Sequence, residues 1–238
     1  MADAADAWRG DHPWAGIYDF FVQRGQLSRG LGWLVWGTDV RRLYRSAGAI
    51  GSMPRGTAIL DIPCGGGVAF RGLRPEQDVR YVAADVSPAM LERARREAVR
   101  RGLEQIEYVE ADVAALPFAD GEFDLCVSFT GLHCFDDPQA AVAELARCLA
   151  PGGRLVGSGL LTGSLRYEPM IVLGRIGGLM GPGGSADDVK RWLAAAGLED
   201  VALERSGALG YFSARRPKRA ARSSARRSTS PRSGRSAR

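Results

Sequence analysis

The sequence predicts an α/β fold in which a doubly wound, mostly parallel sheet is covered by helices on both faces. After Pro54-Arg55-Gly56, short apolar runs alternate with longer helical patterns, which is typical of strand–helix–strand units. The first of these runs carries Asp61 and passes into three consecutive glycines, Gly65–Gly67. The last two runs are separated by a tight turn at Ser206-Gly207, so we expect them to pair antiparallel.

The boundaries of the individual elements also follow from the residues. A helix begins after Ser87, a candidate N-cap, and closes at Gly102. A second helix begins at Asp136 or Asp137 and stops at Pro151-Gly152. The segments predicted as strands are Ala58–Ile62, Val79–Ala84, Ile106–Val109, Phe123–Phe129, Arg154–Ser158, Val201–Arg205 and Leu209–Ala214.

We expect one main domain with an addition at each end. Residues 1–15 are predicted to form a flexible N-terminus. Residues 16–53 carry aromatic and aliphatic side chains at roughly helical spacing, which predicts a helical cap. The main domain should occupy residues 54–216, with the glycine-rich segment 160–184, which has no clear period, as a substrate lid. Residues 217–238 have almost no apolar side chains and are predicted to be a disordered basic tail.

The distribution of charge argues against a nucleic-acid-binding domain. The formal charge is +5, but eight of the 32 Lys and Arg residues lie in the tail, which has no Asp or Glu. The other 24 basic residues are outnumbered by the 27 acidic residues, so the body of the protein has a net charge of −3. A nucleic-acid-binding domain would usually carry its basic residues on the folded part.

The cysteines and the N-terminus predict a cytoplasmic protein. The four cysteines show neither CxxC spacing nor a histidine at zinc-finger distance, so we expect free thiols and no metal site. The N-terminus lacks the basic and apolar regions of a signal peptide, and the longest apolar stretches are too short or too interrupted to span a bilayer.

The glycine turn after the first strand indicates a ligand. Glycine lets the backbone turn with positive φ and approach a ligand closely, at the sheet edge where ligands bind in doubly wound folds. A phosphate-binding Walker loop would need a Lys, which does not follow here. A dinucleotide fingerprint fits at Gly65 and Gly67 but has Phe70 at its third position, and the charge of Asp61 would repel a pyrophosphate. An acid before the turn suits a positively charged group instead.

Two further acids end the next two predicted strands. Asp85 follows the second strand, where an acid accepts both hydroxyls of a ribose in nucleotide-binding folds. Asp112 follows the third strand and precedes Val113, a position that suits an exocyclic adenine amine beside an apolar wall. Either acid alone is more often a helix cap or a solvated turn residue. Together with Asp61 they describe a ligand with an amine, a ribose and an adenine.

Four motifs in this order resemble those of a known family. They are ILDIPCGGG (59–67), YVAADVSPAML (81–91), VEADVAALPFADGEFDLCVSFTGLHCFDD (109–137) and ELARCLAPGGRLV (144–156). The sequence from about Ala58 to Ala214 is similar to class I S-adenosylmethionine-dependent methyltransferases of the small-molecule type, which includes the quinone-biosynthesis C-methyltransferases. The resemblance implies a seven-stranded Rossmann-like sheet with an antiparallel C-terminal hairpin, and S-adenosyl-L-methionine as the cofactor.

The resemblance also implies a role for individual residues. Asp61 and the glycine backbone would meet the methionine part of the cofactor, Asp85 the ribose, and Asp112 with Val113 the adenine. The cofactor-binding residues predicted in this way are Asp61, Gly65, Gly66, Gly67, Asp85, Val86, Asp112, Val113, Phe129, Thr130 and Tyr18.

Phe129, Thr130 and Tyr18 are predicted to lie around the methionine part of the cofactor, and Pro63 lies in the glycine turn itself. Phe129 and Thr130, at the end of the fourth strand, would line the pocket near the sulfonium. Tyr18 of GIYDFF matches a tyrosine that closes over the methionine carboxylate in relatives. Pro63 departs from the commoner form of the turn and should stiffen it without abolishing binding.

The acceptor side is less defined by the residues. Positioning supplies much of the catalysis of an in-line methyl transfer, and a base is needed only when the acceptor must lose a proton. His133, just past the fourth strand, is the candidate base; alternatively, it packs or hydrogen-bonds a backbone group there. An apolar lid favours a hydrophobic acceptor such as a quinone precursor, methylated on oxygen or carbon. The residues expected as its walls, or else as core, are Trp33, Trp36, Tyr167, Met170 and Met180.

Two other functions stay open. The chain would be a non-catalytic binding or regulatory module if it kept only the cofactor fold. A nucleic-acid methyltransferase is less favoured, because Phe129-Thr130-Gly131-Leu132 lacks the Asn/Asp-Pro-Pro-aromatic stretch frequent in amine-methylating nucleic-acid enzymes of this fold. We therefore expect a small-molecule acceptor and no specific nucleic acid. The tail is either a solubilising appendage or a weak contact to a membrane or another anionic surface.

Overall fold

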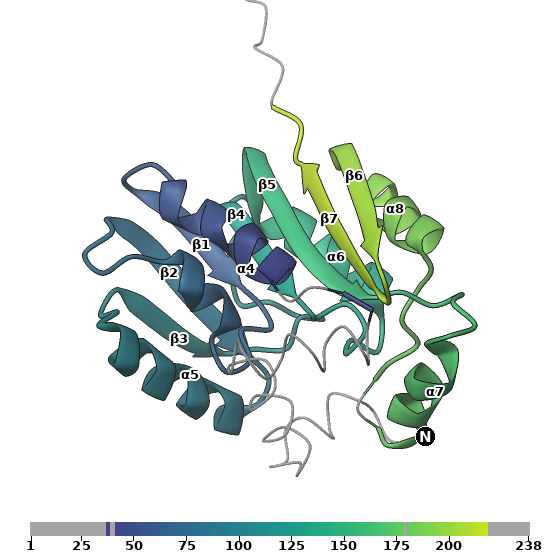
Figure 1. Cartoon of the computed structure of the whole chain (residues 1–238). Helices are drawn as coiled ribbons and strands as arrows, with labels where there is room; N and C mark the ends of the chain where they lie inside the picture. The colour runs from purple at the N-terminus through teal and green to yellow at the C-terminus, as the bar shows by residue number, and fades with distance from the viewer. Residues whose placement is uncertain (1–36, 39–40, 179, 219–238) are drawn as a thin grey trace, which may run out of the picture.

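A computed structural model describes residues 37–38, 41–178 and 180–218. The predicted flexible N-terminus, the helical cap before Gly37 and the basic tail after Lys218 lie outside these residues. The described strands form one sheet in the order β3-β2-β1-β4-β5-β7-β6 (Figure 1). Their bounds are β1 Thr57–Asp61, β2 Val79–Asp85, β3 Ile106–Glu110, β4 Phe123–Phe129, β5 Leu149–Leu160, β6 Glu199–Ser206 and β7 Leu209–Arg215.

The sheet is parallel except for one strand, as the sequence predicts. Strands β3, β2, β1, β4 and β5 pair parallel, and β7 runs antiparallel to both β5 and β6. Ser206 pairs with Leu209, so the hairpin turn consists of Gly207 and Ala208, one residue later than predicted. Gly207 has φ +58°, which a glycine adopts without strain.

The predicted caps begin and end the helices. Ser87 Oγ accepts a hydrogen bond from the Met90 N–H, and Gly102 closes that helix with φ +65°. Asp137, one of the two predicted N-caps, accepts from the Ala140 N–H at 2.9 Å. The helices of the described residues are α4 Arg41–Gly48, α5 Pro88–Arg101, α6 Pro138–Cys148, α7 Glu168–Ile176 and α8 Ala186–Ala195, with short 3-10 helices η1 Ala49–Ser52 and η2 Val68–Gly72.

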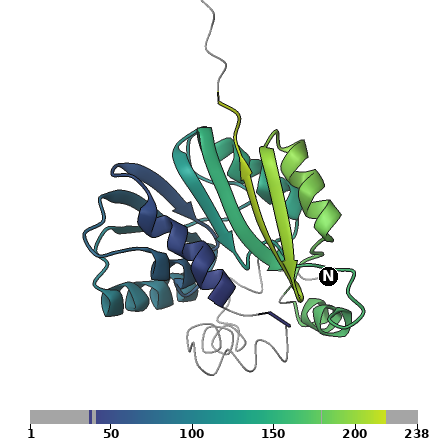
Figure 2. The ribbon, with the colours of Figure 1, turned by 45° about the horizontal axis from the view of Figure 1, so that its top comes forward.

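Helices cover both faces of the sheet (Figures 1 and 2). Helices α4 and α5 pack on one face, where Leu43, Leu91 and Ala94 join a core cluster with Ile59 and Tyr81 of the strands. Helices α6 and α8 pack on the other face through a second cluster. Because both faces are buried, the central strands are apolar on both sides, which explains their continuous hydrophobic runs.

The segment 160–184, predicted as a lid from residues without a clear period, contains the helix α7. This helix lies beyond the carboxyl end of β5, whereas the C-terminal end of β7 lies at the opposite edge of the sheet (Figure 1). Among the described residues, no helix is both long and apolar enough to cross a membrane.

Candidate functional site

The carboxyl ends of β1, β2, β3 and β4 meet at one edge of the sheet. We call the residues there, Asp61–Gly67, Asp85–Ser87, Ala111–Val113 and Phe129–Gly131, the cofactor edge. The strand order makes these four turns neighbours, because β3, β2, β1 and β4 are adjacent in the sheet. Ten of the eleven predicted cofactor-binding residues lie here. The eleventh, Tyr18, lies outside the described residues.

The glycines of the turn after β1 are required for different reasons. Gly65 and Gly67 both have positive φ, +51° and +84°, and Gly66 lies half-buried between them. A Cβ on Gly67 would lie 2.5 Å from the Phe70 ring, so this glycine is required by packing. No atom of the described residues lies within 4 Å of a Cβ built on Gly65. None of these residues therefore fills the space next to Gly65, and its missing side chain leaves room for a ligand there.

Asp61 is a buried acid held by a tyrosine. It is 1% exposed, and the Tyr81 hydroxyl donates a hydrogen bond to its Oδ2 at 2.9 Å. Burial raises the pKa of Asp61 to about 8, the Tyr81 hydrogen bond lowers it, and the charge of nearby Asp85 raises it further. Asp61 is therefore mainly protonated at neutral pH, at a place where a cation would stabilise its charged form.

Asp85 joins two turns of the cofactor edge. Its Oδ2 accepts from the Gly65 N–H at 2.8 Å, and its Oδ1 accepts from the Ser87 N–H at 3.0 Å. Burial raises the pKa of Asp85 to about 6, against the lowering effect of backbone hydrogen bonds that include one from Val86. Because each carboxylate oxygen can accept more than one hydrogen bond, Asp85 retains acceptor capacity for a ribose hydroxyl.

Asp112 and Val113 form the start of the loop after β3. The Asp112 carboxylate is partly exposed and accepts from the Ala114 N–H at 2.9 Å, which closes a turn at this acid. Val113 is 9% exposed and packs in the cluster beneath α6. The pair thus places a polar group next to a buried apolar side chain.

The end of β4 carries an unusual backbone. Thr130 has φ +56°, a conformation that β-branched residues rarely adopt. Its N–H donates to Ser158 Oγ at 3.1 Å, and its hydroxyl donates to the Phe129 carbonyl at 2.6 Å. Backbone strain of this kind clusters at functional sites. The side chain of Phe129 is 2% exposed and belongs to the core cluster with Ile59.

His133 contacts the end of β5 and the segment 161–184. It is buried, and its Nδ1 accepts a hydrogen bond from the Leu160 N–H at 3.3 Å. Its carbonyl accepts from the Gly181 N–H at 2.9 Å. Burial lowers the pKa of His133 to about 4, so it is neutral at pH 7 with its proton on Nε2. These are the contacts expected for the structural alternative rather than for a general base.

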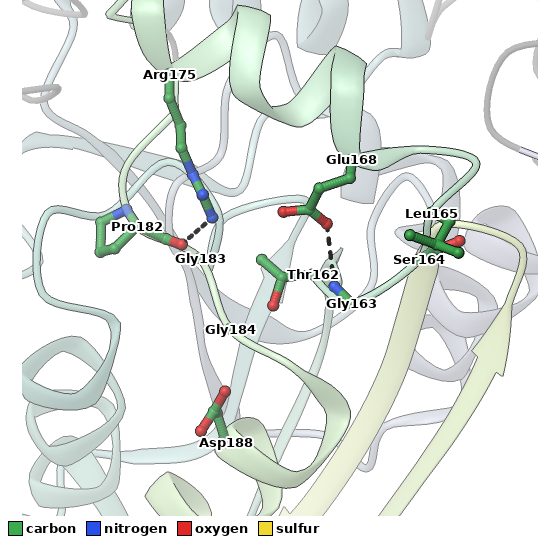
Figure 3. A pocket seen from close by; sticks show the side chains of 10 residues that line it. All are labelled: Thr162, Gly163, Ser164, Leu165, Glu168, Arg175, Pro182, Gly183, Gly184 and Asp188. Atoms are coloured by element: carbon green, nitrogen blue, oxygen red, sulfur yellow. Dashed lines mark hydrogen bonds between the residues drawn. The ribbon is translucent and has the colours of Figure 1, made fainter.

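A cleft of about 470 Å³ lies along the segment 161–184 (Figure 3). Polar, charged and glycine residues form most of its lining, whereas the sequence predicts apolar walls on the acceptor side. Glu168 accepts from the Gly163 N–H at 3.1 Å, and Arg175 donates to the carbonyls of Gly181 and Pro182. Its charged groups thus brace the surrounding loops. None of the residues that line the cleft belongs to the cofactor edge.

The predicted walls of the acceptor pocket are only partly described. Tyr167 is 8% exposed and is part of the core, as the alternative interpretation holds, and Met180 packs against the same cluster. Trp33 and Trp36 lie outside the described residues, as does the side chain of Met170. Within the part of the chain that the structure describes, no group of His, Cys, Asp and Glu is arranged to hold a metal ion.

Two side chains of the site were not predicted. Tyr81 supports Asp61, and Ser158 holds the strained Thr130. Tyr81 had a detectable signal: a tyrosine in an otherwise apolar central strand needs a partner for its hydroxyl. Ser158 had none, because its partner is 28 residues away and the contact depends on how β4 and β5 are paired.

Comparison with known proteins agrees with this geometry. Residues 60–157 match the model of a family described as a methyltransferase domain. The demethylmenaquinone methyltransferase of Thermus thermophilus is 42% identical over 125 residues, which are 52% of this chain and 56% of that protein. The ubiquinone/menaquinone biosynthesis C-methyltransferase UbiE of Roseobacter denitrificans is 34% identical over 125 residues, 51% and 50% of the two chains. The matched region thus spans about half the length of these relatives.

Solved structures agree on the fold. The phosphoethanolamine N-methyltransferase 2 of Haemonchus contortus, in complex with S-adenosyl-L-methionine, has a TM-score of 0.70 over 92% of this chain and 61% of that chain, at 15% identity. Such a low identity shows the fold alone. The match of residues 60–157 to the methyltransferase-domain model and the relatives from quinone biosynthesis confirm the resemblance that the motifs indicate.

Proposed function

We propose that the chain is an S-adenosylmethionine-dependent methyltransferase acting on a small, hydrophobic, quinone-like acceptor, with the methyl group placed on carbon. The observation that carries this proposal is the cofactor edge. It combines one buried acid of raised pKa, an acid joined to the glycine turn, and an acid beside an apolar wall, on three adjacent strands. When bound, S-adenosyl-L-methionine would supply an electrophilic methyl group on a sulfonium.

The residues at this edge fit such a cofactor. The open space at Gly65 leaves room for a ligand against the backbone of the turn. Asp85 would accept from the ribose hydroxyls, with Val86 beside it, and Asp112 would accept from the adenine amine against Val113. Phe129 and Thr130 would stand near the reacting group, and Tyr18 would close over the methionine carboxylate.

Asp61 would recognise the positive end of the methionine part. In the free protein its pKa of about 8 keeps most of it protonated at neutral pH. An ammonium group close to it would favour the carboxylate form, so we expect binding to release a proton. This coupling would discriminate in favour of a cationic ligand over a neutral one of the same shape.

The nature of the acceptor is proposed from the relatives and from the apolar side chains on the acceptor side. The matched relatives are named for methylation of demethylmenaquinone and for the synthesis of ubiquinone and menaquinone. In this chain, Leu165, which precedes α7, and Leu173 and Ile176 of α7 are exposed. Helix α7 itself lies beyond the carboxyl end of β5 (Figure 1). A lipophilic acceptor would be compatible with such a surface.

The test starts with the cofactor. Calorimetric titration of S-adenosylmethionine and S-adenosylhomocysteine into the protein, in two buffers of different ionisation enthalpy, should give micromolar binding and show the released proton. Incubation of the complex with a demethylated menaquinone in its reduced form should then yield a product heavier by one methylene unit and an equal amount of S-adenosylhomocysteine. Binding without turnover of this or related quinols would favour the non-catalytic module, and no binding would refute the enzyme.

Further proposals concern the rest of the chain. A cytoplasmic location, the domain boundaries at residues 15, 53 and 216, and a weak contact of the basic tail with anionic surfaces are proposed from the sequence. The tail follows β7, whose end lies at the edge of the sheet opposite to the cofactor edge. A contact made there would leave the cofactor edge free.

A further inference from the structure

The loop that carries Asp112 and Val113 runs from the carboxyl ends of the parallel strands to their amino ends. It begins after Glu110, the last residue of β3, and leads to Phe123, the first residue of β4. Its first residue is fixed, because the Ala111 N–H donates to the Asp85 carbonyl at 3.0 Å. The residues after Val113 are held by contacts with α6.

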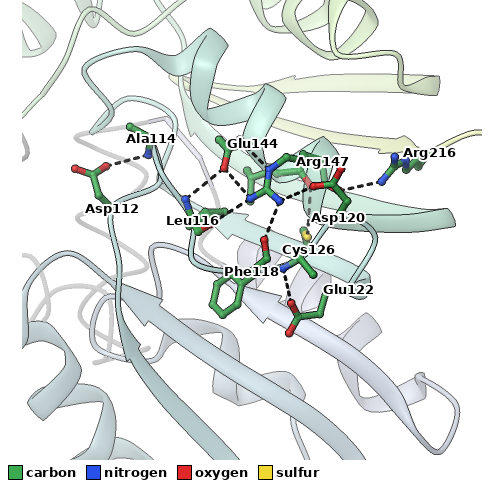
Figure 4. Close-up of polar contacts among 12 residues, drawn as sticks. Asp112, Ala114, Leu116, Phe118, Asp120, Glu122, Cys126, Glu144, Arg147 and Arg216 are labelled. Carbon is green, nitrogen blue, oxygen red and sulfur yellow. Dashed lines mark hydrogen bonds and ion pairs between the residues drawn. The ribbon is translucent and has the colours of Figure 1, made fainter.

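Arg147, in the last turn of α6, holds the second half of this loop (Figure 4). Its guanidinium donates to the Phe118 carbonyl at 2.8 Å and to the Leu116 carbonyl at 3.2 Å. It also donates to Asp120 Oδ1 at 2.8 Å, and its own carbonyl accepts from the Gly121 N–H at 2.9 Å. One residue thus contacts four positions of the loop.

Glu144, one turn earlier on α6, completes the arrangement. Its carboxylate accepts from Arg147 at 2.9 and 3.0 Å and also from the Leu116 N–H at 3.3 Å. Leu116 is therefore held at both its N–H and its carbonyl by one ion pair. The hydrogen bonds from Arg147 lower the pKa of Glu144, so the pair stays charged at neutral pH. The fork of a guanidinium is suited to holding several acceptors in fixed directions.

Only residues 112–115 lie between the two fixed points of the loop. These points are Ala111, which donates to Asp85 of β2, and Leu116, which contacts the ion pair on α6. Val113 and Leu116 are both buried in the cluster beneath α6, so a shift of Leu116 would be transmitted to Val113 through a short chain and shared packing. We propose that Arg147 is a positioning residue for the cofactor: through Leu116 it holds the wall against which the adenine ring binds. This inference rests on the proposed function.

The test compares two ligands that differ only by the adenine. S-adenosylhomocysteine and S-ribosylhomocysteine, which has a hydroxyl in place of the base, are titrated into the wild type and into Arg147→Met. We expect the variant to bind S-adenosylhomocysteine about tenfold more weakly, which corresponds to about 1.4 kcal/mol. The dissociation constant of S-ribosylhomocysteine, measured by displacement, should change less than twofold.

A matched control separates this effect from the loss of any ion pair. Arg101 has the same side-chain exposure as Arg147, 28%, donates to Glu97 Oε1 at 2.6 Å, and ends α5 at the same edge of the sheet as the end of α6. Arg101→Met should bind both ligands as the wild type does. If Arg147→Met fails to fold, Arg147→Lys, which keeps the charge but loses the fork, serves in its place.

The outcomes are distinct. Equal weakening of both ligands by the Arg147 variant, or no weakening of either, overturns the positioning role while leaving the proposed function intact. Failure of the wild type to bind S-adenosylhomocysteine overturns the proposed function and this inference with it.

Discussion

The cofactor edge and the segment 161–184 lie next to each other but are built differently. At the cofactor edge the acids are fixed by strand ends, by backbone N–H groups and by the Tyr81 hydroxyl. In the segment 161–184, three large apolar side chains are mostly exposed: Leu165 at 98%, Leu173 at 68% and Ile176 at 79%. The side chains of Glu168 and Arg175 form hydrogen bonds with the backbone of the segment itself.

This difference separates two tasks. Parallel strands bring their carboxyl ends to one edge, so the position of a cofactor is inherited from the sheet itself. A segment beyond the sheet is free to vary in sequence and shape, which suits recognition of an acceptor. His133 lies between the two regions, since it follows β4 and Gly131 in the chain and hydrogen-bonds Leu160 and Gly181. Substitutions should therefore affect binding at the cofactor edge and stability at His133.

The largest effect is expected at Asp85. In Asp85→Asn, the amide nitrogen would face one of the backbone N–H groups from which the carboxylate now accepts hydrogen bonds, and the charge would be lost. Hydrogen bonds to a charged group contribute about 1.5–3 kcal/mol. We expect S-adenosylhomocysteine to bind about a hundredfold more weakly at pH 8, measured by calorimetry. Unchanged affinity would show that Asp85 only supports the turn.

The next largest effect is expected at His133, where two substitutions test whether its role is structural. His133→Leu would leave the Leu160 N–H buried without an acceptor and should lower the free energy of unfolding by about 1–3 kcal/mol. His133→Asn offers an amide oxygen near the position of Nδ1 and should lose less, as measured by urea denaturation. If His133→Asn folded normally but methylated its acceptor at least a hundredfold more slowly, His133 would be the general base after all.

A comparison of glycines tests the open space at Gly65. Gly65 and Gly102 have similar positive φ, and a Cβ on either would meet no atom within 4 Å in the part of the chain that the structure describes. Substitution by Ala should therefore cost both about 1 kcal/mol of stability. Only Gly65→Ala should weaken S-adenosylhomocysteine binding, by about tenfold, because its methyl group would enter the ligand space. Equal affinities in the two variants would place the ligand elsewhere.

The smallest effect concerns the pH dependence of stability. The folded-state pKa of Asp61, about 8, lies above its unfolded value of 3.8, so its protonation stabilises the fold fully below pH 3.8 and is lost as pH rises through 8. Asp85, with a pKa of about 6, contributes in the same direction at lower pH, and His133 contributes oppositely between about pH 4 and 6.5.

Between pH 6.5 and 8, Asp61 thus contributes most of these three groups to the change in stability, because the titrations of Asp85 and His133 are largely complete within this interval. Denaturation of the wild type should show stability falling over this interval, whereas Asp61→Asn, which cannot ionise and still accepts from Tyr81, should lose this decline. The same slope in both proteins would mean that the pKa of Asp61 is not raised.

The sequence by itself determined much of this protein. Strand–helix alternation fixed the class of fold, and cap residues such as Ser87, Gly102 and Asp137 marked the helix ends, because these signals are local. The acids at 61, 85 and 112 could be predicted to meet, because parallel strands place their carboxyl ends at one edge. The exposed helix α7 was missed, because its residues follow no clear apolar period.

Only the tertiary structure decided how the site is held. The hydrogen bonds from Tyr81 to Asp61, from Thr130 to Ser158 and from Arg147 to the loop after β3 join residues 20 to 31 positions apart. The burial that raises the pKa of Asp61 and lowers that of His133 likewise arises from elements packed around them. Composition and spacing show which residue types are available for a site. Strand register and packing determine which hydrogen bonds these residues form and whether their side chains are charged.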